Sequence, residues 1–404
     1  MIAPAPVIPA IEVQATSRYP LGMPLNRFIA DVWQRRPLLV RKAIADFRSP
    51  LTPEDLAGLA CETFALSRLV IHDPARDHWE LRTGPFEEAD FARLPPTHWT
   101  LLVQDVDKWD ADVAALLRRF DFLPSWRIDD IMVSYAVDGG SVGAHIDQYD
   151  VFLLQGQGRR RWQISTDEHA SKAFRDDVEL KLLRTFSATH EWLLEAGDML
   201  YLPPGVPHHG VADGPCLTLS IGMRAPAVSE MVADLAASIA ESLPEERRYT
   251  DQGIGPARVR GEIDADALER VEAALRPLMA VDATLLRRWF GSFITRYRTA
   301  HESVPRSRPL APASLHERLG RGARLLRNPW TRVAWQRTPN AANLFVAGSM
   351  YAVSRGFATQ VCADEPLTAE NFAALRPGDR AVLLDLVNAG HFALARARPT
   401  RSSS

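Results

Sequence analysis

A histidine and an aspartate two residues apart, followed far downstream by a histidine in a proline-rich loop, constrain this chain more than any other feature. The pair is His145-Ile146-Asp147, and the later histidine is His208 of Leu202-Pro-Pro-Gly-Val-Pro-His-His-Gly. Residues i and i+2 of a β-strand point to the same face, so His145 and Asp147 project into one cavity. Two imidazoles and one carboxylate on one face of a metal form the facial triad of non-haem Fe(II) oxygenases. The spacing therefore favours a metal site at His145, Asp147 and His208.

The same residues also allow plainer interpretations. A His–Asp pair at a strand end can serve only as a hydrogen bond, and His78-Trp79-Glu80 repeats the pattern without a well-placed third ligand. His209 competes with His208, because neighbouring residues of a strand point to opposite faces. The glycines of Gly139–Gly143 favour the metal interpretation, because they allow close backbone packing at a cavity mouth. The prolines around His208 stiffen its loop, and they too favour the metal interpretation.

Three consecutive arginines, Arg159, Arg160 and Arg161, stand at the start of a predicted strand. Alternation along a strand turns at least one guanidinium toward the barrel interior, where a buried cation requires an anion. Arginine binds carboxylates bidentately, so a dicarboxylate co-substrate would supply that anion. The spacing does not say which arginine points inward. We expect Gly156-Gln-Gly158 to form a hairpin turn, and the alternation of side chains along a strand cannot be counted across a turn.

Composition and charge narrow the class of protein. The chain has 404 residues, of which 46% are hydrophobic and 24% charged, which is typical of a soluble globular protein with two or three domains. A formal net charge of −3 gives no drive toward nucleic acid or anionic membranes, so direct nucleic-acid binding is not expected. Three scattered cysteines fit a reducing compartment. With no signal peptide and no membrane span in the pattern, we expect a cytoplasmic protein.

Secondary-structure signals change along the chain. Residues 24–60 look largely helical, with a helix start at Thr52-Pro-Glu-Asp. Between residues 128 and 224, six or more short strands rich in β-branched and aromatic residues predict a jelly-roll barrel, with a second hairpin turn at Glu195–Asp198. Helical periodicity follows in residues 228–240, 265–279 and 283–297. A linker at 301–314 precedes a mixed module of short strands and helices that resembles a winged helix.

At this point the residues resemble a known family, the bacterial JmjC-type ribosomal oxygenases, which are arginine hydroxylases. The resemblance covers nearly the whole chain, reaching loosely to Leu386-Val-Asn-Ala-Gly-His. One departure is His209, which stands where the family has an acidic residue after the metal-binding histidine. The most specific matching stretches are Arg127-Ile-Asp-Asp-Ile-Met, Gly143-Ala-His-Ile-Asp-Gln-Tyr-Asp-Val-Phe, Gln155-Gly-Gln-Gly-Arg-Arg-Arg-Trp, Tyr201-Leu-Pro-Pro-Gly-Val-Pro-His and Ser220-Ile-Gly-Met-Arg-Ala-Pro.

The resemblance implies an α+β architecture in three parts. Residues 1–226 would form a double-stranded β-helix (cupin, JmjC) catalytic domain with an N-terminal helical extension. Residues 227–300 would form a helical dimerisation domain, making the protein a homodimer. Residues 301–404 would hold the linker and a small winged-helix-like domain.

The resemblance also implies a reaction and roles for individual residues. Fe(II) would be held by His145, Asp147 and His208, and 2-oxoglutarate would chelate the metal. The substrate would be an arginine of the sixteenth large-subunit ribosomal protein, hydroxylated at Cβ. The other implied roles are Arg160 on the distal carboxylate of 2-oxoglutarate, Ser220 beside the co-substrate, and Asp130, Met132 and Tyr149 in the substrate-arginine pocket. A guanidinium in a narrow pocket needs a carboxylate, which independently favours Asp130; the plainer alternatives are a turn aspartate for Asp130 and barrel core for Met132 and Tyr149.

Other functions fit parts of the pattern. A lysine- or histidine-directed JmjC hydroxylase or demethylase would share the iron site and differ in the pocket. A catalytically silent cupin and winged-helix protein would bind the ribosome without needing the three candidate ligands. A metal-dependent cupin isomerase would not need an inward arginine.

Overall fold

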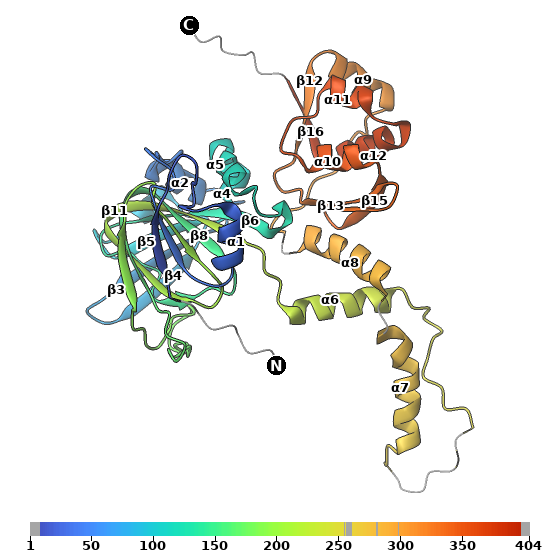
Figure 1. Cartoon of the computed structure of the whole chain (residues 1–404), viewed down its shortest axis with the longest axis horizontal. Coiled ribbons are helices and arrows are strands. Elements are labelled where there is room, and N and C mark those ends of the chain that lie inside the picture. Colours follow the sequence, from blue (N-terminus) through green and yellow to red (C-terminus); the bar gives the residue numbers. More distant parts are fainter. Residues whose placement is uncertain (1–8, 254, 256–260, 280–281, 298, 397–404) are drawn as a thin grey trace. The chain divides into compact units, whose positions relative to one another are not determined.

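The computed structural model of the chain describes residues 9–253, 255, 261–279, 282–297 and 299–396 (Figure 1). It divides into two compact units, Met1–Ala225 and Pro226–Ser404. The three-part division expected from the sequence stays a prediction. Among the described residues, no helix combines the length and the apolar character needed to cross a bilayer.

One large sheet of eleven strands organises the first unit. Its order is β1-β2-β10-β8-β11-β6-β5-β3-β4, with β7 paired to β11 and β9 paired to β8. The strands are β1 Ile11–Gln14, β2 Leu38–Arg41, β3 Ser67–Asp73, β4 His78–Thr83, β5 Trp99–Val103, β6 Ile128–Ala136, β7 His145–Ile146, β8 Val151–Ile164, β9 His190–Leu194, β10 Met199–Leu202 and β11 Pro207–Met223. The helices are α1 Leu25–Asp31, α2 Pro53–Ala60, α3 Glu88–Ala92, α4 Val106–Trp109 and α5 Ala111–Leu116, with short 3-10 turns at Leu117–Phe120 and Ser125–Arg127.

The two faces of this sheet have different roles because side chains alternate along each strand. On one face, Phe152 of β8 and Leu219 of β11 join a core that includes Phe28 of α1 and Leu56 of α2. On the other face, Leu153 and Trp162 of β8 belong to a separate apolar cluster. The helices thus cover one face, and the opposite face lines the barrel interior.

Two sequence expectations in this unit were wrong. Residues 24–60 are not largely helical, because β2 inserts between α1 and α2 and pairs with β1 and β10. The expected hairpin turn at Gly156–Gly158 does not form, because β8 runs straight through it and stays paired to β11. Gly158 has a φ of +64°, and a Cβ there would lie 2.2 Å from the carbonyl oxygen of Pro215. This glycine therefore serves an irregularity in the pairing of β8 and β11.

Two other local expectations have mixed outcomes. The turn at Glu195–Asp198 exists but is not a hairpin, because β9 and β10 both pair with β8 and not with each other. The helix start at Thr52 is confirmed: its hydroxyl accepts from the Asp55 N–H, and the Asp55 carboxylate accepts from the Thr52 N–H. This capping box begins α2.

Helices begin the second unit, as the periodicity predicted, and a mixed module follows them. Two small sheets, β12-β16 and β13-β14-β15, share an apolar core with α9 to α12. The elements are α6 Val228–Glu241, α7 Ala265–Met279, α8 Ala283–Arg296, α9 Pro312–Gly320, β12 Ala323–Arg327, β13 Val333–Arg337, β14 Ala342–Val346, β15 Ser349–Val353, α10 Arg355–Cys362, α11 Ala369–Ala374, α12 Pro377–Asn388 and β16 Phe392–Arg396.

Candidate active site

The structure brings His145, Asp147 and His208 together. Strand β7 pairs antiparallel with the start of β11, and the register places His145 directly opposite His208. The Asp147 carboxylate lies 4.0 Å from Nε2 of His145 and 3.6 Å from Nε2 of His208. One ligand atom from each residue lies within 4.8 Å of the other two, a spacing that one metal ion can bridge.

Hydrogen bonds orient both imidazoles for metal binding. Nδ1 of His145 lies 3.0 Å from the Gly143 carbonyl oxygen, and Nδ1 of His208 lies 2.9 Å from the Val206 carbonyl oxygen. A carbonyl accepts only, so each ring carries its proton on Nδ1 and leaves the Nε2 lone pair free. Both free lone pairs lie on the side of the Asp147 carboxylate.

His208, and not His209, joins this cluster. The His208 side chain is 2% exposed. Burial, with His145 as the next cause, lowers the pKa of His208 to about 4, so its ring is neutral at pH 7 as a metal ligand must be. His209 pairs with Gln163 and packs its ring against Phe186. The alternative that the sequence left open is thus decided geometrically by strand parity.

Arg160 is the arginine that points inward. It is 3% exposed, whereas Arg159 pairs with Asp213 and Arg161 with Glu191 on the outer face. The Arg160 guanidinium donates to the Gly210 carbonyl at 3.2 Å and to the Ser134 hydroxyl at 3.5 Å.

No carboxylate among the described residues pairs with Arg160. Burial lowers the pKa of this guanidinium, and its Nε–H finds no acceptor within the described ranges. The same holds for the buried indole N–H of Trp162 beside it. Two buried donors and an uncompensated positive charge call for an anionic ligand.

Gly210 lets the side chains of Trp162 and Arg160 pack directly against its backbone. A Cβ at this position would lie 2.7 Å from the Trp162 ring and 2.8 Å from Nε of Arg160. The centroid of the Trp162 ring lies 5.2 Å from Cζ of Arg160 and 5.9 Å from the centroid of the His208 ring. The anion site and the metal cluster therefore share the barrel interior. The sequence analysis did not identify Gly210 or Ser134. A signal was available, because Gly210 follows His208 by two residues and Ser134 follows Met132 by two residues, so each lies on the same face of its strand.

Asp130, Met132 and Ser220 line the same interior face. Met132 lies directly opposite Ser220 in the pairing of β6 with β11, and both are half-buried. Asp130 precedes Met132 by two residues, so its side chain points to the same side. Gly222, two residues after Ser220, makes room for it, because a Cβ there would lie 3.3 Å from Oδ1 of Asp130.

Asp130 is a buried carboxylate without a cation. It is 6% exposed, it accepts one hydrogen bond from the Asp105 N–H at 3.1 Å, and no lysine or arginine of the described ranges pairs with it. Burial, followed by the charges of Asp105 and Asp129, raises the pKa of Asp130 to about 7. Such a group is suited to receive a cationic ligand.

Tyr149 is not barrel core. The residue is 41% exposed, yet its hydroxyl is enclosed beside the Asp147 carboxylate. Burial first, and Asp147 second, raise the pKa of this hydroxyl. Tyr149 therefore lies between the metal cluster and the surface, with its hydroxyl beside Asp147.

Comparisons with known proteins agree with this arrangement. A model of the JmjC domain matches residues 115–231, and a model of the ROXA-like winged helix matches residues 278–393. The ribosomal protein uL16 3-hydroxylase of Escherichia coli (strain K12) is 34% identical over 384 residues, which span 95% of this chain and 99% of that protein. The chain belongs to the ribosomal oxygenase family.

Solved structures of ribosomal oxygenases share its fold. An X-ray structure of E. coli ycfD matches with a TM-score of 0.81 and 34% identity, covering 93% of this chain and 99% of that one. A structure of the E. coli ribosomal oxygenase YcfD with cobalt and 2-oxoglutarate matches with a TM-score of 0.77, 33% identity and the same coverage. The expected family, the JmjC β-domain and the C-terminal winged helix are confirmed.

The residues of this ribosomal oxygenase fit both groups that the YcfD complex contains. Two free imidazole nitrogens and a carboxylate oxygen make a donor set for a divalent metal. The buried N–H groups of Arg160 and Trp162, which have no acceptor among the described residues, suit a small dicarboxylate.

We predict that Asp130→Asn stabilises the free protein at pH 8. The folded-state pKa of about 7 lies above the ordinary value of 3.8, so wild-type stability falls as the pH rises from about 4 to 7. The amide oxygen of asparagine keeps the bond from Asp105 without the buried charge. The free energy of unfolding should rise by about 4 kcal/mol at pH 8, and the difference between the variant and the wild type should close near pH 4. Thermal unfolding of both proteins across this pH range measures the difference in the free energy of unfolding. A difference that does not change with pH would contradict the prediction.

Proposed function

We propose that this protein is an Fe(II)- and 2-oxoglutarate-dependent dioxygenase that hydroxylates Cβ of an arginine in a uL16-type ribosomal protein. One observation carries the proposal. A three-ligand metal cluster, a buried arginine and a buried aspartate share the interior of one barrel, and neither charge has a salt-bridge partner among the residues described. A metal, a dicarboxylate and a guanidinium together satisfy all three.

Each residue has a defined part in this reaction. His145, Asp147 and His208 hold the metal, and Arg160 binds the far carboxylate of 2-oxoglutarate while Ser220 lines its pocket. When bound, iron and 2-oxoglutarate supply the oxidation, placing one atom of dioxygen in the substrate C–H bond and the other in succinate, with release of carbon dioxide.

The remaining pocket residues position the substrate. Asp130 pairs with the substrate guanidinium, and Met132 and Tyr149 flank the side chain. Holding Cβ, and no other carbon, at the metal is the protein's main contribution to the rate and to the choice of carbon. Ionised Asp130 is needed for this pairing, so substrate affinity should increase as the pH rises through about 7.

Lysine-directed and histidine-directed activities are the alternatives. Relatives named bifunctional lysine-specific demethylase and histidyl-hydroxylase NO66 match only part of the chain. The buried Asp130 favours a cationic side chain over a neutral imidazole, and the planar guanidinium of arginine matches a carboxylate bidentately. The carboxylates of Asp105, Asp107 and Asp129 near Asp130 repel phosphate, so we propose that the catalytic unit acts on protein and not on nucleic acid.

Mass spectrometry tests the activity directly. Incubating the protein with Fe(II), 2-oxoglutarate and ribosomal proteins should add about 16 Da, one oxygen atom, to a uL16-type protein at one arginine. Asp147→Ala should abolish this product, because two imidazoles alone leave the metal site incomplete. Full turnover by Asp147→Ala, or the oxygen on lysine or histidine, would reject the proposal.

Gly210→Ala tests the co-substrate pocket. The added methyl group overpacks the space beside Arg160, which costs about 1–3 kcal/mol and should raise the KM for 2-oxoglutarate about tenfold. Gly58→Ala is the matched control, because nothing lies within 4 Å of a Cβ there. Steady-state kinetics at varied 2-oxoglutarate compare the two; equal KM values would contradict this pocket.

We also propose that the protein is a cytoplasmic homodimer assembled through the helices of the second unit. Leu268, Val271 and Leu275 repeat on one face of α7, and they are 59%, 41% and 50% exposed. Val228 and Val232 of α6 are 71% and 61% exposed. Exposed apolar side chains grouped on consecutive helices are typical of an interaction surface.

Charged substitutions test this assembly. Leu268→Asp combined with Leu275→Asp should convert the dimer to a monomer, because two buried carboxylates would face the partner helix. Ala273→Asp, on the opposite side of α7, should leave the dimer intact. Light scattering coupled to size-exclusion chromatography reports the mass; a monomeric wild type, or a dimeric double variant, would contradict the proposal.

A further inference from the structure

The strand that carries Asp130 loses one neighbour just where Asp130 stands. Strand β5 pairs with β6 only from Thr100 opposite Ala136 to Val103 opposite Val133. Beyond Val133, on the side of residues 129–131, the chain of β5 has already turned away into α4. This stretch of β6 keeps its partner β11 on the other side only.

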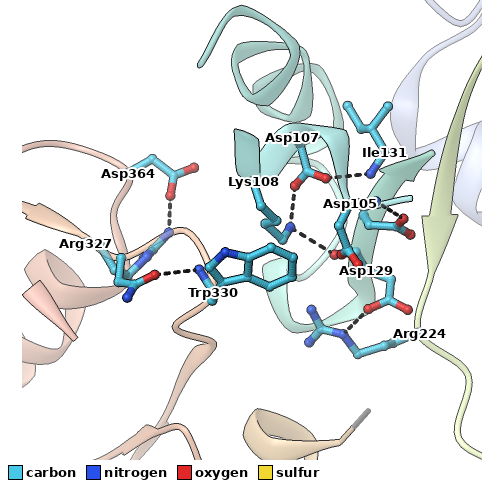
Figure 2. A network of polar contacts seen from close by, with 11 residues as sticks. Asp105, Asp107, Lys108, Asp129, Ile131, Arg224, Arg327, Trp330 and Asp364 are labelled. Atoms are coloured by element: carbon cyan, nitrogen blue, oxygen red, sulfur yellow. Dashed lines mark hydrogen bonds and ion pairs between the residues drawn. The ribbon is translucent and has the colours of Figure 1, made fainter. Parts of the chain in front are cut away.

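Three residues of the α4 turn replace the missing strand. The Asp105 N–H donates to Oδ2 of Asp130 at 3.1 Å, and Oδ1 of Asp107 accepts from the Ile131 N–H at 2.8 Å. Nζ of Lys108 donates to the Asp129 carbonyl at 3.3 Å. We call Asp105, Asp107 and Lys108 the α4 clamp; Figure 2 shows Asp107 and Lys108 reaching the strand at Ile131 and Asp129.

Asp105 and Asp107 of the α4 clamp are buried, and Lys108 is half-buried. Asp107 is 5% exposed, and its carboxylate also pairs with the Lys108 ammonium, which partly offsets the buried charge. Val106, between the clamp residues, is fully buried in the main core of the unit. On the same strand, the Asp129 carboxylate is held by Arg224 at 3.1 Å (Figure 2). The backbone on both sides of Asp130 is therefore fixed by polar contacts to its own unit.

We infer that Asp107 is a positioning residue for the substrate arginine, acting through the Ile131 backbone to aim the Asp130 carboxylate. This inference rests on the proposed function. Asp107 supplies the acceptor that the Ile131 N–H would have found on a neighbouring strand, and a buried N–H without an acceptor is costly. Releasing the strand at this point shifts Asp130, and with it the carbon that a bound arginine presents to the metal.

Asp107→Ala should separate substrate positioning from cofactor binding. The KM for a uL16-type substrate should rise about tenfold or more, because a displaced Asp130 carboxylate pairs less well with the substrate guanidinium. Fewer hydroxylations should occur for each 2-oxoglutarate consumed, whereas the affinities for the metal and for 2-oxoglutarate should not change. Asp107→Asn keeps an oxygen acceptor for the Ile131 N–H and should restore most of the coupling.

Asp198→Ala is the matched control for a loss of stability. Asp198 is also 5% exposed, accepts from the Lys42 N–H at 2.9 Å and pairs with Arg41 at 2.8 Å. It lies just before β10, a strand that pairs with β2 and β8. This variant should lower the melting temperature and leave the ratio of hydroxylation to 2-oxoglutarate consumption at the wild-type value.

The outcomes are distinct. Wild-type KM and coupling in Asp107→Ala, or the same loss of coupling in Asp198→Ala, would overturn the inference. If Asp107→Ala does not fold, Asp107→Glu, which displaces the acceptor of the Ile131 N–H by one methylene, should show the higher KM, and a wild-type KM there would overturn the inference. A wild type that hydroxylates no arginine would reject the proposed function itself.

Discussion

The pairing of two short stretches of backbone, β7 and the start of β11, is the constraint on which the rest of this structure depends. It sets His145 opposite His208 and brings Asp147 to both. Each ring is oriented by the backbone carbonyl of the residue two positions before it, so the backbone itself sets the direction of the two metal-binding nitrogens. A shift of one residue in this register would turn His208 out of the barrel and His209 in.

Two opposite charges are buried in the same interior with no salt-bridge partner in the part of the chain that the structure describes, and this is costly for the free protein. Arg160 lies beside Ser134 of β6, and Asp130 lies four residues, about 13 Å, earlier on that strand. Filling either place with a hydrophobic residue would be expected to stabilise the fold. The cost is understandable where ligands of complementary charge, a dicarboxylate at one end and a guanidinium at the other, complete the site. Stability is here given up for binding.

The pattern of residues predicted much of the fold correctly, and the failures share a cause. Helices α6, α7 and α8 follow the expected periodicity because an amphipathic pattern is local. The hairpin at Gly156–Gly158 failed because the need for glycine there comes from Pro215 on the neighbouring strand. In the same way, the four-residue strand β2 forms because it can pair with both β1 and β10. Those partners lie elsewhere in the chain, so the local sequence of β2 does not reveal them.

The sequence by itself determined which chemical groups are available: a histidine and an aspartate two residues apart, a histidine in a proline-rich loop, and a run of arginines. For the arginines, the two-residue period of a strand also means that at least one side chain points inward. The same period does not account for Asp147, because β7 ends at Ile146. Only the tertiary structure decided that His208 and Arg160 are the members that point inward. It also decided that Asp107 holds the strand of Asp130. Those choices depend on register and on neighbours distant along the chain, since pairing between strands, and not the pattern within one, sets which side chains meet.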